Sequence, residues 1–289
     1  MAISRTPEYA DPAEAAHDYL VVVPDPPASL GSFEAVPTLT VTVVIPTLNE
    51  ERNIAWVVER LPAMVDEIII VDGRSTDRTI EVALAIRPDI VVVLETRPGK
   101  GAALRRAFAA ATGDVIVMLD ADGSMDPGEI PAFVDEIVAG ADLVKGSRFL
   151  DGGGSVDISR LRRSGNQALL AFANILYRSR FSELCYGFMA FRRDCLPQLG
   201  LRATGFEIET EIVVRAVKAR LEIVEVASFE SARRFGESNL RTFRDGWRVA
   251  KTLLRERFAS GLDLDVLIEP PTVALAPVSV QEPQIRKEP

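Results

Sequence analysis

The sequence predicts an α/β fold, a doubly wound and mostly parallel sheet followed by an α+β C-terminal half. Between residues 41 and 145, short β-branched runs that are apolar on both faces alternate with longer amphipathic stretches. Polar residues gather where these runs end, as ligand-binding residues do at the carboxyl ends of parallel strands. After residue 146 the alternation gives way to a glycine-rich loop and longer helical stretches.

Five strands are expected in the first half, at 41–45, 67–71, 89–94, 114–119 and 141–146. The segments between them are expected to form crossover helices. The one at 50–61 has Asn49 as its expected N-cap, with Glu50 and Glu51 in its first turn. We find no internal repeat.

The second half is expected to contain the glycine-rich loop 151–155, a helix at 160–180, the segment GFMAFRR at 187–193 and a helix near 205–220. A strand at 222–230 and an arginine-rich amphipathic helix near 240–259 complete the set. These elements are expected to close over the edge of the sheet.

The composition excludes several classes of protein. With 289 residues, 47% of them hydrophobic and 26% charged, the chain is neither wholly disordered nor collagen-like. Its two cysteines, Cys185 and Cys195, are too few for a disulfide framework and fit a reducing compartment. The single histidine, His17, excludes most zinc enzymes and histidine-based triads.

Charge and proline content divide the chain into three parts. The net charge of −9 comes mostly from residues 1–40 and 262–289, which also hold most of the prolines. We therefore expect a flexible acidic N-terminal tail at 1–40, one folded domain at 41–261 and a proline-rich tail at 262–289. The domain itself is nearly neutral, so the acidic balance says little about its ligand, and no nucleic-acid partner is expected.

No targeting or membrane-spanning segment is recognisable. The chain starts without a basic segment and apolar core, and no run reaches the roughly 18 apolar residues of a spanning helix. We therefore expect a cytoplasmic protein.

The strongest chemical signal is Asp120-Ala121-Asp122, directly after an apolar run. Two carboxylates at alternate positions beyond a strand can hold one hard cation, which in turn binds diphosphate oxygens. A simple strand-end turn is one alternative. Another is the opening motif of aspartate-nucleophile phosphatases, although that motif normally opens its domain and no later pair of acids completes a phosphatase site here.

Two further segments carry polar groups at strand ends. In VDGRSTDRT, residues 71–79, Asp72 can accept hydrogen bonds from a base or ribose, while Asp77 is expected to cap the next helix. In the segment at 97–108, Lys100 lies between two glycines ahead of a helix, an arrangement suited to an anion. The segment lacks P-loop spacing, and a glycine turn with a solvated lysine is the alternative.

Several arginines follow the strands and the glycine-rich loop. Guanidinium groups suit phosphate oxygens, although each such arginine is individually as consistent with a solvated surface position. The arginines concerned are Arg148, Arg160, Arg162, Arg163, Arg233 and Arg234.

The order of the motifs is more informative than any one of them. VVIPTLNEERNI, VDGRSTDRT, GKGAALRRAF, LDADGSMDP, KGSRF, LCYGFMAFRR and FGESNL follow one another over residues 41–250. As an ordered set they resemble family 2 glycosyltransferases of the GT-A fold, and most of all those similar to dolichyl- or polyprenyl-phosphate mannosyl- and glucosyltransferases.

The resemblance implies a donor site and a metal site. The residues implied to bind the nucleotide-sugar are Pro46, Thr47, Glu50, Asp72, Lys100, Asp120, Ala121, Asp122, Arg233 and Ser238. Asp120 and Asp122 match the DxD motif, which implies Mg2+ or Mn2+ and the donor diphosphate. The segment containing Arg233 and Ser238 matches one that closes over the donor.

The resemblance also implies an acceptor site. Arg148 matches the arginine of the G-S-R-[YF] motif, and Arg162 or Arg163 matches a later basic position; both are implied to hold the acceptor phosphate. The catalytic set implied is Asp122, Arg148 and Arg163. The chain departs from the family pattern at Gly73, where a second Asp is frequent, and at Glu183, where Asp is usual.

The implied reaction is metal-dependent, inverting transfer of a hexose from GDP-mannose or UDP-glucose to a polyprenyl phosphate. A soluble phosphorylated acceptor is one variant, and a non-catalytic sugar-nucleotide-binding protein another alternative, against which the intact acidic pair argues. A hydroxyl acceptor would need a base, for which Glu207, Glu209 and Glu211 are the candidates, with Glu211 expected to be solvated.

The segment 238–258 interleaves apolar and basic residues, among them Trp247, Leu254 and Phe258 beside Arg244 and Lys251. Such a helix can lie on an anionic membrane surface, which would make the protein peripheral at the cytoplasmic face. The alternative, to which we give equal weight, is a helix that packs against the domain and exposes a basic outer face.

Overall fold

The computed structural model describes residues 39–156, 158–237 and 242–259. The predicted tails therefore fall almost entirely outside the described residues, and so does Ser238. The expected boundaries of the folded domain remain a prediction.

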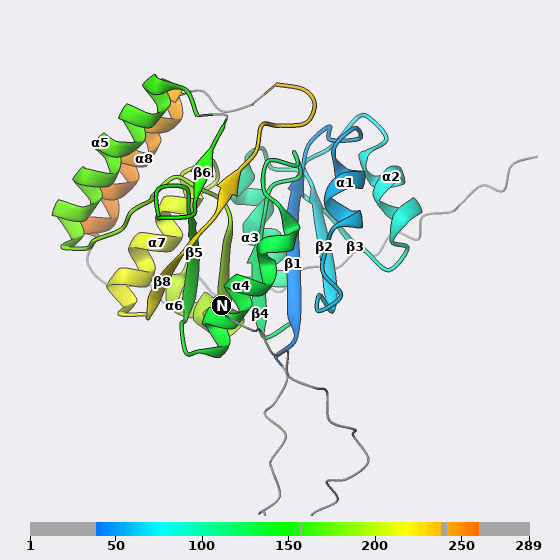
Figure 1. Cartoon of the computed structure of the whole chain (residues 1–289), viewed down its shortest axis with the longest axis horizontal. Helices are drawn as coiled ribbons and strands as arrows, with labels where there is room; N and C mark the ends of the chain where they lie inside the picture. The colour runs from blue at the N-terminus through cyan, green and yellow to red at the C-terminus, as the bar shows by residue number, and fades with distance from the viewer. Residues whose placement is uncertain (1–38, 157, 238–241, 260–289) are drawn as a thin grey trace, which may run out of the picture. The chain divides into compact units, whose positions relative to one another are not determined.

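Seven strands form one sheet, in the order β3-β2-β1-β4-β7-β5-β8 (Figure 1). Their bounds are β1 Val41–Thr47, β2 Glu67–Asp72, β3 Val91–Leu94, β4 Val115–Met118, β5 Leu143–Ser147, β7 Met189–Arg192 and β8 Ile223–Ala227. All neighbours are parallel except β7, which runs antiparallel to β4 and β5. The predicted α/β fold with a mostly parallel sheet is confirmed.

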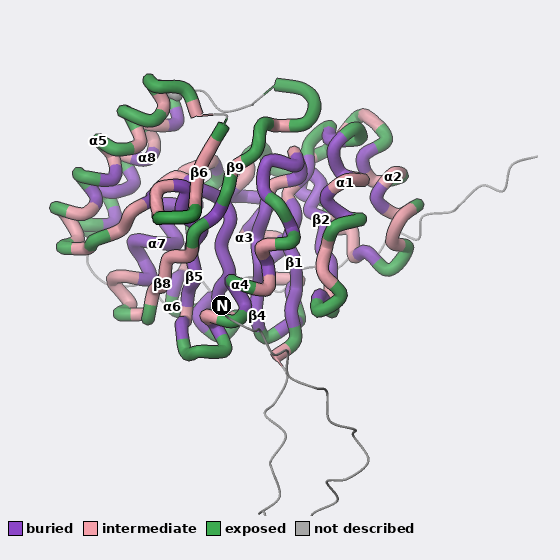
Figure 2. The backbone as a smooth tube through the Cα atoms, in the orientation of Figure 1, coloured by how far each residue is buried: buried purple, intermediate pink, exposed green. Residues whose placement is uncertain are grey.

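Both faces of the sheet are covered, which explains why the strand sequences are apolar at successive positions. In β1, Val43 and Ile45 belong to a core cluster with α1 (Ile54–Glu59), α2 (Thr79–Ile86) and α4 (Ile130–Val138). Val44 belongs to the opposite cluster, with α3 (Lys100–Ala110) and α7 (Ile208–Ala219). Figure 2 shows the central strands buried between these layers, while the edge strands β3 and β8 are only partly buried.

The first helix begins later than expected. α1 starts at Ile54, and Asn49 is not its N-cap, which corrects the helix predicted at 50–61. Asn49 has a left-handed backbone (φ 58°), and its Oδ1 accepts a hydrogen bond from the Thr76 N–H at 2.8 Å. Because Asn49 joins the loop after β1 to the loop after β2, the chain cannot begin its helix there.

The second half contains the expected helices. α5 (Arg160–Tyr177) ends where Arg178 adopts a left-handed conformation, and α8 (Thr242–Phe258) packs beside α5 and α7. The short helix α6 (Leu196–Leu199) follows β7. Single 3-10 turns occupy Pro127–Glu129 and Arg193–Cys195.

The strand predicted at 222–230 is divided in two. β8 ends at Ala227, and β9 (Phe229–Glu230) pairs instead with β6 (Gly154–Ser155) in a separate two-stranded sheet. At the break, the Ser228 N–H donates to the Ser147 carbonyl at 3.0 Å. The Ser228 hydroxyl donates to Glu129, so the side chain fixes the point at which the chain leaves the large sheet.

Ion pairs to buried carboxylates hold α8 against α7. Arg215 donates from Nε to Oε2 of Glu256 at 2.9 Å, and Arg255 donates to Oε1 of Glu211 at 3.2 Å. The expectation that Glu211 is solvated is wrong, because its side chain is fully buried and also accepts from the Ala203 N–H. On the other flank, the Tyr177 hydroxyl donates to the Leu253 carbonyl and ties α5 to α8.

Within the described ranges, no helix combines the length and hydrophobicity that crossing a membrane requires. Cys185 and Cys195 are both free thiols, in agreement with the absence of a disulfide framework.

The start of α3 is packed tightly against the loop at 203–205. Gly99 has a φ of +113°, and a Cβ on it would lie 2.1 Å from the Thr204 carbonyl oxygen. A Cβ on Gly101 would lie 2.6 Å from the Ala203 carbonyl oxygen. The two glycines therefore allow the close approach that fixes the position of Lys100 between them.

We predict that Gly101→Ala lowers the free energy of unfolding by about 1–3 kcal/mol, because the added methyl group overlaps a backbone carbonyl. Gly246→Ala in α8 is the matched control, since no described atom beyond its chain neighbours and its own helix backbone lies within 4 Å of its Cβ position. That control is expected to gain about 0.5–1 kcal/mol from helix propensity. Urea unfolding of both variants measures the difference, and equal effects would contradict the packing argument.

Candidate active site

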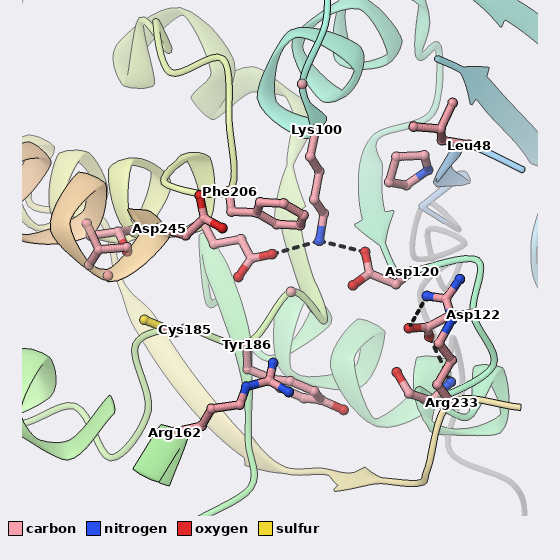
Figure 3. Close-up of a pocket in the computed structure, with 18 of the residues that line it drawn as sticks. Leu48, Lys100, Asp120, Asp122, Arg162, Cys185, Tyr186, Phe206, Arg233 and Asp245 are labelled. Carbon is pink, nitrogen blue, oxygen red and sulfur yellow. Dashed lines mark hydrogen bonds and ion pairs between the residues drawn. The ribbon is translucent and has the colours of Figure 1, made fainter. Parts of the chain in front are cut away.

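A large cavity opens at the carboxyl ends of the central parallel strands. Its volume is about 1180 Å³, and its lining comes from the loops after β1, β2 and β4 together with α3, α5, α7 and α8. Asp120 and Asp122 lie in it just beyond β4 (Figure 3). The prediction that polar residues meet at this edge of the sheet is confirmed.

Asp120 shares a lysine with a glutamate from another helix. The Nζ of Lys100 lies 2.6 Å from Oδ1 of Asp120 and 2.7 Å from Oε1 of Glu209, which α7 contributes (Figure 3). Burial disfavours the ammonium, but the two carboxylates outweigh it, so the pKa of Lys100 lies above its ordinary value. The alternative of a solvated lysine is wrong, because only 9% of its side chain is exposed.

Asp120 is itself perturbed. Burial raises its pKa to about 6 against the opposing effect of Lys100, and the nearby Asp122 and Glu209 carboxylates add to the increase. A further positive charge nearby would stabilise the ionised form of this carboxylate.

Asp122 shares an arginine with a second glutamate. Arg233 donates from Nη1 to Oδ2 of Asp122 at 3.2 Å and from Nη2 to Glu50. Glu50 is in turn held by the side-chain amide of Asn53 at 2.6 Å. We call the group formed by Glu50, Lys100, Asp120, Asp122, Glu209 and Arg233 the carboxylate end of the cavity.

The two aspartates suit a hard divalent cation by their chemistry. Magnesium is commonly held by one or two carboxylates, with substrate phosphates and water completing its coordination. Among the residues that the structure describes, no cluster of three or more metal-ligating side chains occurs. Asp120 and Asp122 therefore fit a cation that is shared with a ligand better than one enclosed by protein alone.

The loops after β1 and β2 form the wall beside the carboxylate end. Pro46 and Thr47 line the cavity as predicted, and so does the buried Ala121. Asp72 does not line it. Its carboxylate accepts from the hydroxyls of Thr47 and Ser75 and from the N–H groups of Arg74 and Ser75. This carboxylate holds the turn after β2, so the structure does not bring Asp72 to the ligand space predicted for it.

Asp77 is not the N-cap of α2 that its motif predicts, because Arg78 occupies that position; Asp77 lies one residue earlier and holds the start of the helix. Its Oδ1 accepts hydrogen bonds from the backbone N–H and hydroxyl of Thr79, the first residue of α2. These hydrogen bonds to the charged form lower the pKa of Asp77 although burial opposes them.

Arg148 lies deeper than its predicted role suggests. It lines the cavity, but its Nε donates to Glu183 at 2.9 Å and its Nη1 to Glu230 at 2.9 Å. A third bond runs from Nη2 to the Cys185 carbonyl at 3.1 Å. Among the described residues, these bonds use three of the five N–H groups of the guanidinium.

The two adjacent arginines of α5 differ. Arg162 lines the cavity, and no ion pair of its side chain occurs among the described residues (Figure 3). The Arg163 guanidinium lies 5.3 Å from the Phe149 ring centre, and the residue is not part of the lining. Of the three predicted acceptor-binding arginines, Arg148 and Arg162 line the cavity, whereas Arg163, also predicted to be catalytic, does not.

The opposite end of the cavity is largely apolar. Its lining includes Ile158, Leu161, Leu169, Cys185, Trp247, Val249 and Ala250, which we call the apolar end. Burial raises the pKa of the Cys185 thiol to about 12, so this side chain contributes as a neutral group. α5 and α8 form the two sides of this end.

Two of the three glutamates considered as bases do not reach the cavity. Glu211 is fully buried in its ion pairs, and Glu207 uses one oxygen to accept from the Gly205 N–H. Only Glu209 is a lining residue. Sequence reasoning missed Glu230 and Tyr186, whose place in the lining depends on loops rather than on any local pattern.

A family model describes most of this region. Residues 42–200 match the model of glycosyl transferase family 2. The match extends from β1 through β7 and includes the Asp120 and Asp122 pair.

Curated relatives belong to the same group. A low-salt glycan biosynthesis hexosyltransferase of Haloferax volcanii is 35% identical over 74% of this chain, which covers 53% of that protein. The chain thus spans about half the length of this relative. A polyprenol monophosphomannose synthase of Mycolicibacterium smegmatis is 31% identical over 71% of this chain and 82% of its own length.

Solved structures share the fold. The glucosyl-3-phosphoglycerate synthase of Mycobacterium tuberculosis, in complex with Mn2+, UDP and glucosyl-3-phosphoglycerate, superposes with a TM-score of 0.62 and 27% identity. The alignment covers 77% of this chain and 81% of that one. The same protein has also been crystallised with Mg2+ and UDP.

These comparisons favour a glycosyltransferase over a phosphatase and agree with the predicted GT-A resemblance. By its family model, its relatives and its fold, this chain belongs to glycosyl transferase family 2 and is a glycosyltransferase.

Proposed function

We propose that the protein transfers a hexose from a nucleotide-sugar, GDP-mannose or UDP-glucose, to a polyprenyl-phosphate acceptor with inversion at the anomeric carbon. The observation that carries this proposal is the division of the cavity. Asp120 and Asp122 occupy one end, while Arg162 and the apolar end face them from α5 and α8. One cavity thereby offers an anion-binding and metal-binding site next to a lipid-compatible wall.

The donor is assigned to the carboxylate end. Asp120 and Asp122 would hold Mg2+ or Mn2+, whose positive charge stabilises the departing nucleoside diphosphate. Relatives in the fold comparison bind these cations together with UDP, which supports the assignment. Lys100 and Arg233 already lie beside the two aspartates, where they can donate to diphosphate oxygens.

The nucleoside is assigned to the wall beside it. Pro46 and Thr47 line the cavity at the end of β1, next to Gly73 and Arg74 from the loop after β2. We assign Glu50 and Asp72 supporting roles, because one holds Arg233 and the other holds the turn at Ser75.

The acceptor phosphate is assigned to Arg162, with the guanidinium of Arg148 behind it. An ionised phosphate oxygen is already a nucleophile, so its attack needs no strong general base. The prenyl chain would lie along the apolar end, between α5 and α8. A polyprenol monophosphomannose synthase among the relatives supports this class of acceptor.

A hydroxyl acceptor is the second candidate, and Glu209 favours it. This glutamate lines the cavity and could take a proton through the oxygen that Lys100 does not occupy. Release of nucleoside diphosphate from a panel of nucleotide-sugars, with prenyl phosphates or soluble acceptors, distinguishes the two.

The partner proposed for the outer surface is an anionic membrane. Exposed apolar side chains recur at helical spacing along α5 and α8, including Ile175 (79% exposed), Trp247 (72%) and Phe258 (75%). Every charged residue of α5 is basic, and the two acids of α8, Asp245 and Glu256, are buried. In a protein with a net charge of −9, this concentration of exposed basic groups complements anionic lipid head groups.

The same surface leads into the cavity. Leu161 on α5 and Trp247 on α8 are both exposed and both line the apolar end. A lipid phosphate could therefore pass from a bilayer to Arg162 without its chain crossing water, which would suit a peripheral enzyme.

Asp122→Ala is expected to abolish turnover and the metal-dependent part of nucleotide binding, because one of the two proposed cation ligands is removed. Calorimetric titration with UDP or GDP, with and without Mn2+, measures binding separately from activity. Asp135→Ala, an exposed aspartate of α4, serves as the control and should bind like the wild type. Retained metal-dependent binding in Asp122→Ala would remove the proposed role.

Arg162→Ala is expected to raise the KM for prenyl phosphate at least tenfold while leaving nucleotide affinity unchanged, because it removes a charge-assisted contact worth about 1.5–3 kcal/mol. The neighbouring Arg163→Ala makes the same change in charge outside the cavity and should stay within about twofold of the wild type. If the two variants behave alike, the acceptor phosphate does not lie at Arg162.

The protein is expected to float with liposomes that contain anionic lipid at low salt and to remain behind with neutral ones. Trp247→Ala combined with Phe258→Ala should weaken this flotation. Leu94→Ala, which removes an exposed apolar side chain from β3, should not. If the wild type fails to float with anionic liposomes, the proposed membrane surface is wrong.

A further inference from the structure

One short segment touches both ends of the cavity. Residues 228–234, which we call the strap, run from the end of β8 through β9 toward Asp122. Its backbone is fixed on both sides, by hydrogen bonds that involve Ser147, Gly154 and Val156 on one side and Asp122 and Ser124 on the other. The strap therefore joins the loop after β4 to the loop that leads into α5.

Glu230 is the strap residue on the acceptor side. It lines the cavity, and its Oε2 accepts from Nη1 of Arg148 at 2.9 Å and from the Ser155 hydroxyl at 2.5 Å. Arg148 carries a second carboxylate, Glu183, at its Nε. Glu230 is thus an anion that already uses an N–H donor of Arg148, whose guanidinium is proposed to support an acceptor phosphate.

Arg233 is the strap residue on the donor side, three positions further along. It bridges Asp122 and Glu50 and is proposed above to donate to the donor diphosphate. The strap therefore supplies an anion to the acceptor site and a cation to the donor site. Each of these two side chains is paired with a group that a ligand would compete for.

We propose that Glu230 is a positioning residue that couples occupancy of the acceptor site to the placement of Arg233 over the donor. This inference rests on the function proposed above. An acceptor phosphate beside Arg148 competes with Glu230 for its N–H groups and repels it as a like charge. A diphosphate beside Asp122 competes for Arg233 in the same way.

The two ligands consequently loosen opposite ends of one strap. The ligand that binds first loses the binding free energy that is needed to release the strap. The second ligand then binds with higher affinity. Because such coupling is reciprocal, the acceptor should tighten donor binding by the same factor as the donor tightens acceptor binding.

The test measures this factor in the full-length protein. Calorimetry gives the Kd of UDP and of GDP with Mn2+, each with and without saturating farnesyl phosphate. For the nucleotide that binds, wild type should gain about fivefold or more in affinity when farnesyl phosphate is present. In Glu230→Gln the ratio should fall close to one, because its neutral side chain no longer competes with phosphate as an anion.

Glu222→Gln is the matched control. It removes one exposed carboxylate just before β8, away from the strap, and should keep the wild-type ratio. Thermal unfolding establishes that both variants are folded. A merely structural role for Glu230 would weaken both ligands and leave the ratio unchanged.

Two results would overturn the inference while leaving the proposed function intact. One is a wild type that binds both ligands without coupling, and the other is a folded Glu230→Gln variant that retains the wild-type ratio. A wild type that binds neither nucleotide with Mn2+ would instead contradict the proposed function.

Discussion

The cavity depends on two positively charged side chains, each of which holds a pair of carboxylates together. Lys100 joins Asp120 to Glu209, and Arg233 joins Asp122 to Glu50. Four acids this close, with little access to water, would repel one another without these partners. Since Lys100 begins α3 and Arg233 lies in the strap, electrostatics fixes where both segments meet the end of β4. The tight glycine contacts at the start of α3 serve the same placement.

Much of this arrangement could be predicted from the sequence. Runs that are apolar at successive positions identify strands covered on both faces, and the chain order of their polar ends locates the Asp120 and Asp122 edge. The glycines around Lys100 indicate an anion site ahead of α3, and the family resemblance points to Arg162 or Arg163; the structure places Lys100 and Arg162 in the cavity lining. The helices of the second half were also found, because α5 and α8 have strong amphipathic patterns.

The errors arise where a side chain has a partner that is distant in the sequence. Asn49 is a residue type that commonly caps helices, but its side-chain oxygen accepts a hydrogen bond from the Thr76 N–H instead. Asp72 follows a strand as a ligand-binding residue would, yet its carboxylate accepts four hydrogen bonds from the protein itself. Glu211 has the spacing of a solvated helix start, but Arg215 and Arg255 bury it. Local pattern shows what a residue can do, whereas tertiary contacts decide which of its options is used.

The two ends of the cavity come from different stretches of the chain. The carboxylate end is built mainly before residue 125. The apolar end is built mainly from α5, which lies inside the part that matches the family model, and from α8, which lies outside it. Under the proposed function, substitutions at cavity-facing positions of these two helices would change the acceptor end and leave Asp120 and Asp122 at the sheet edge. A lineage of such enzymes is therefore free to change what receives the sugar while keeping the machinery that delivers it.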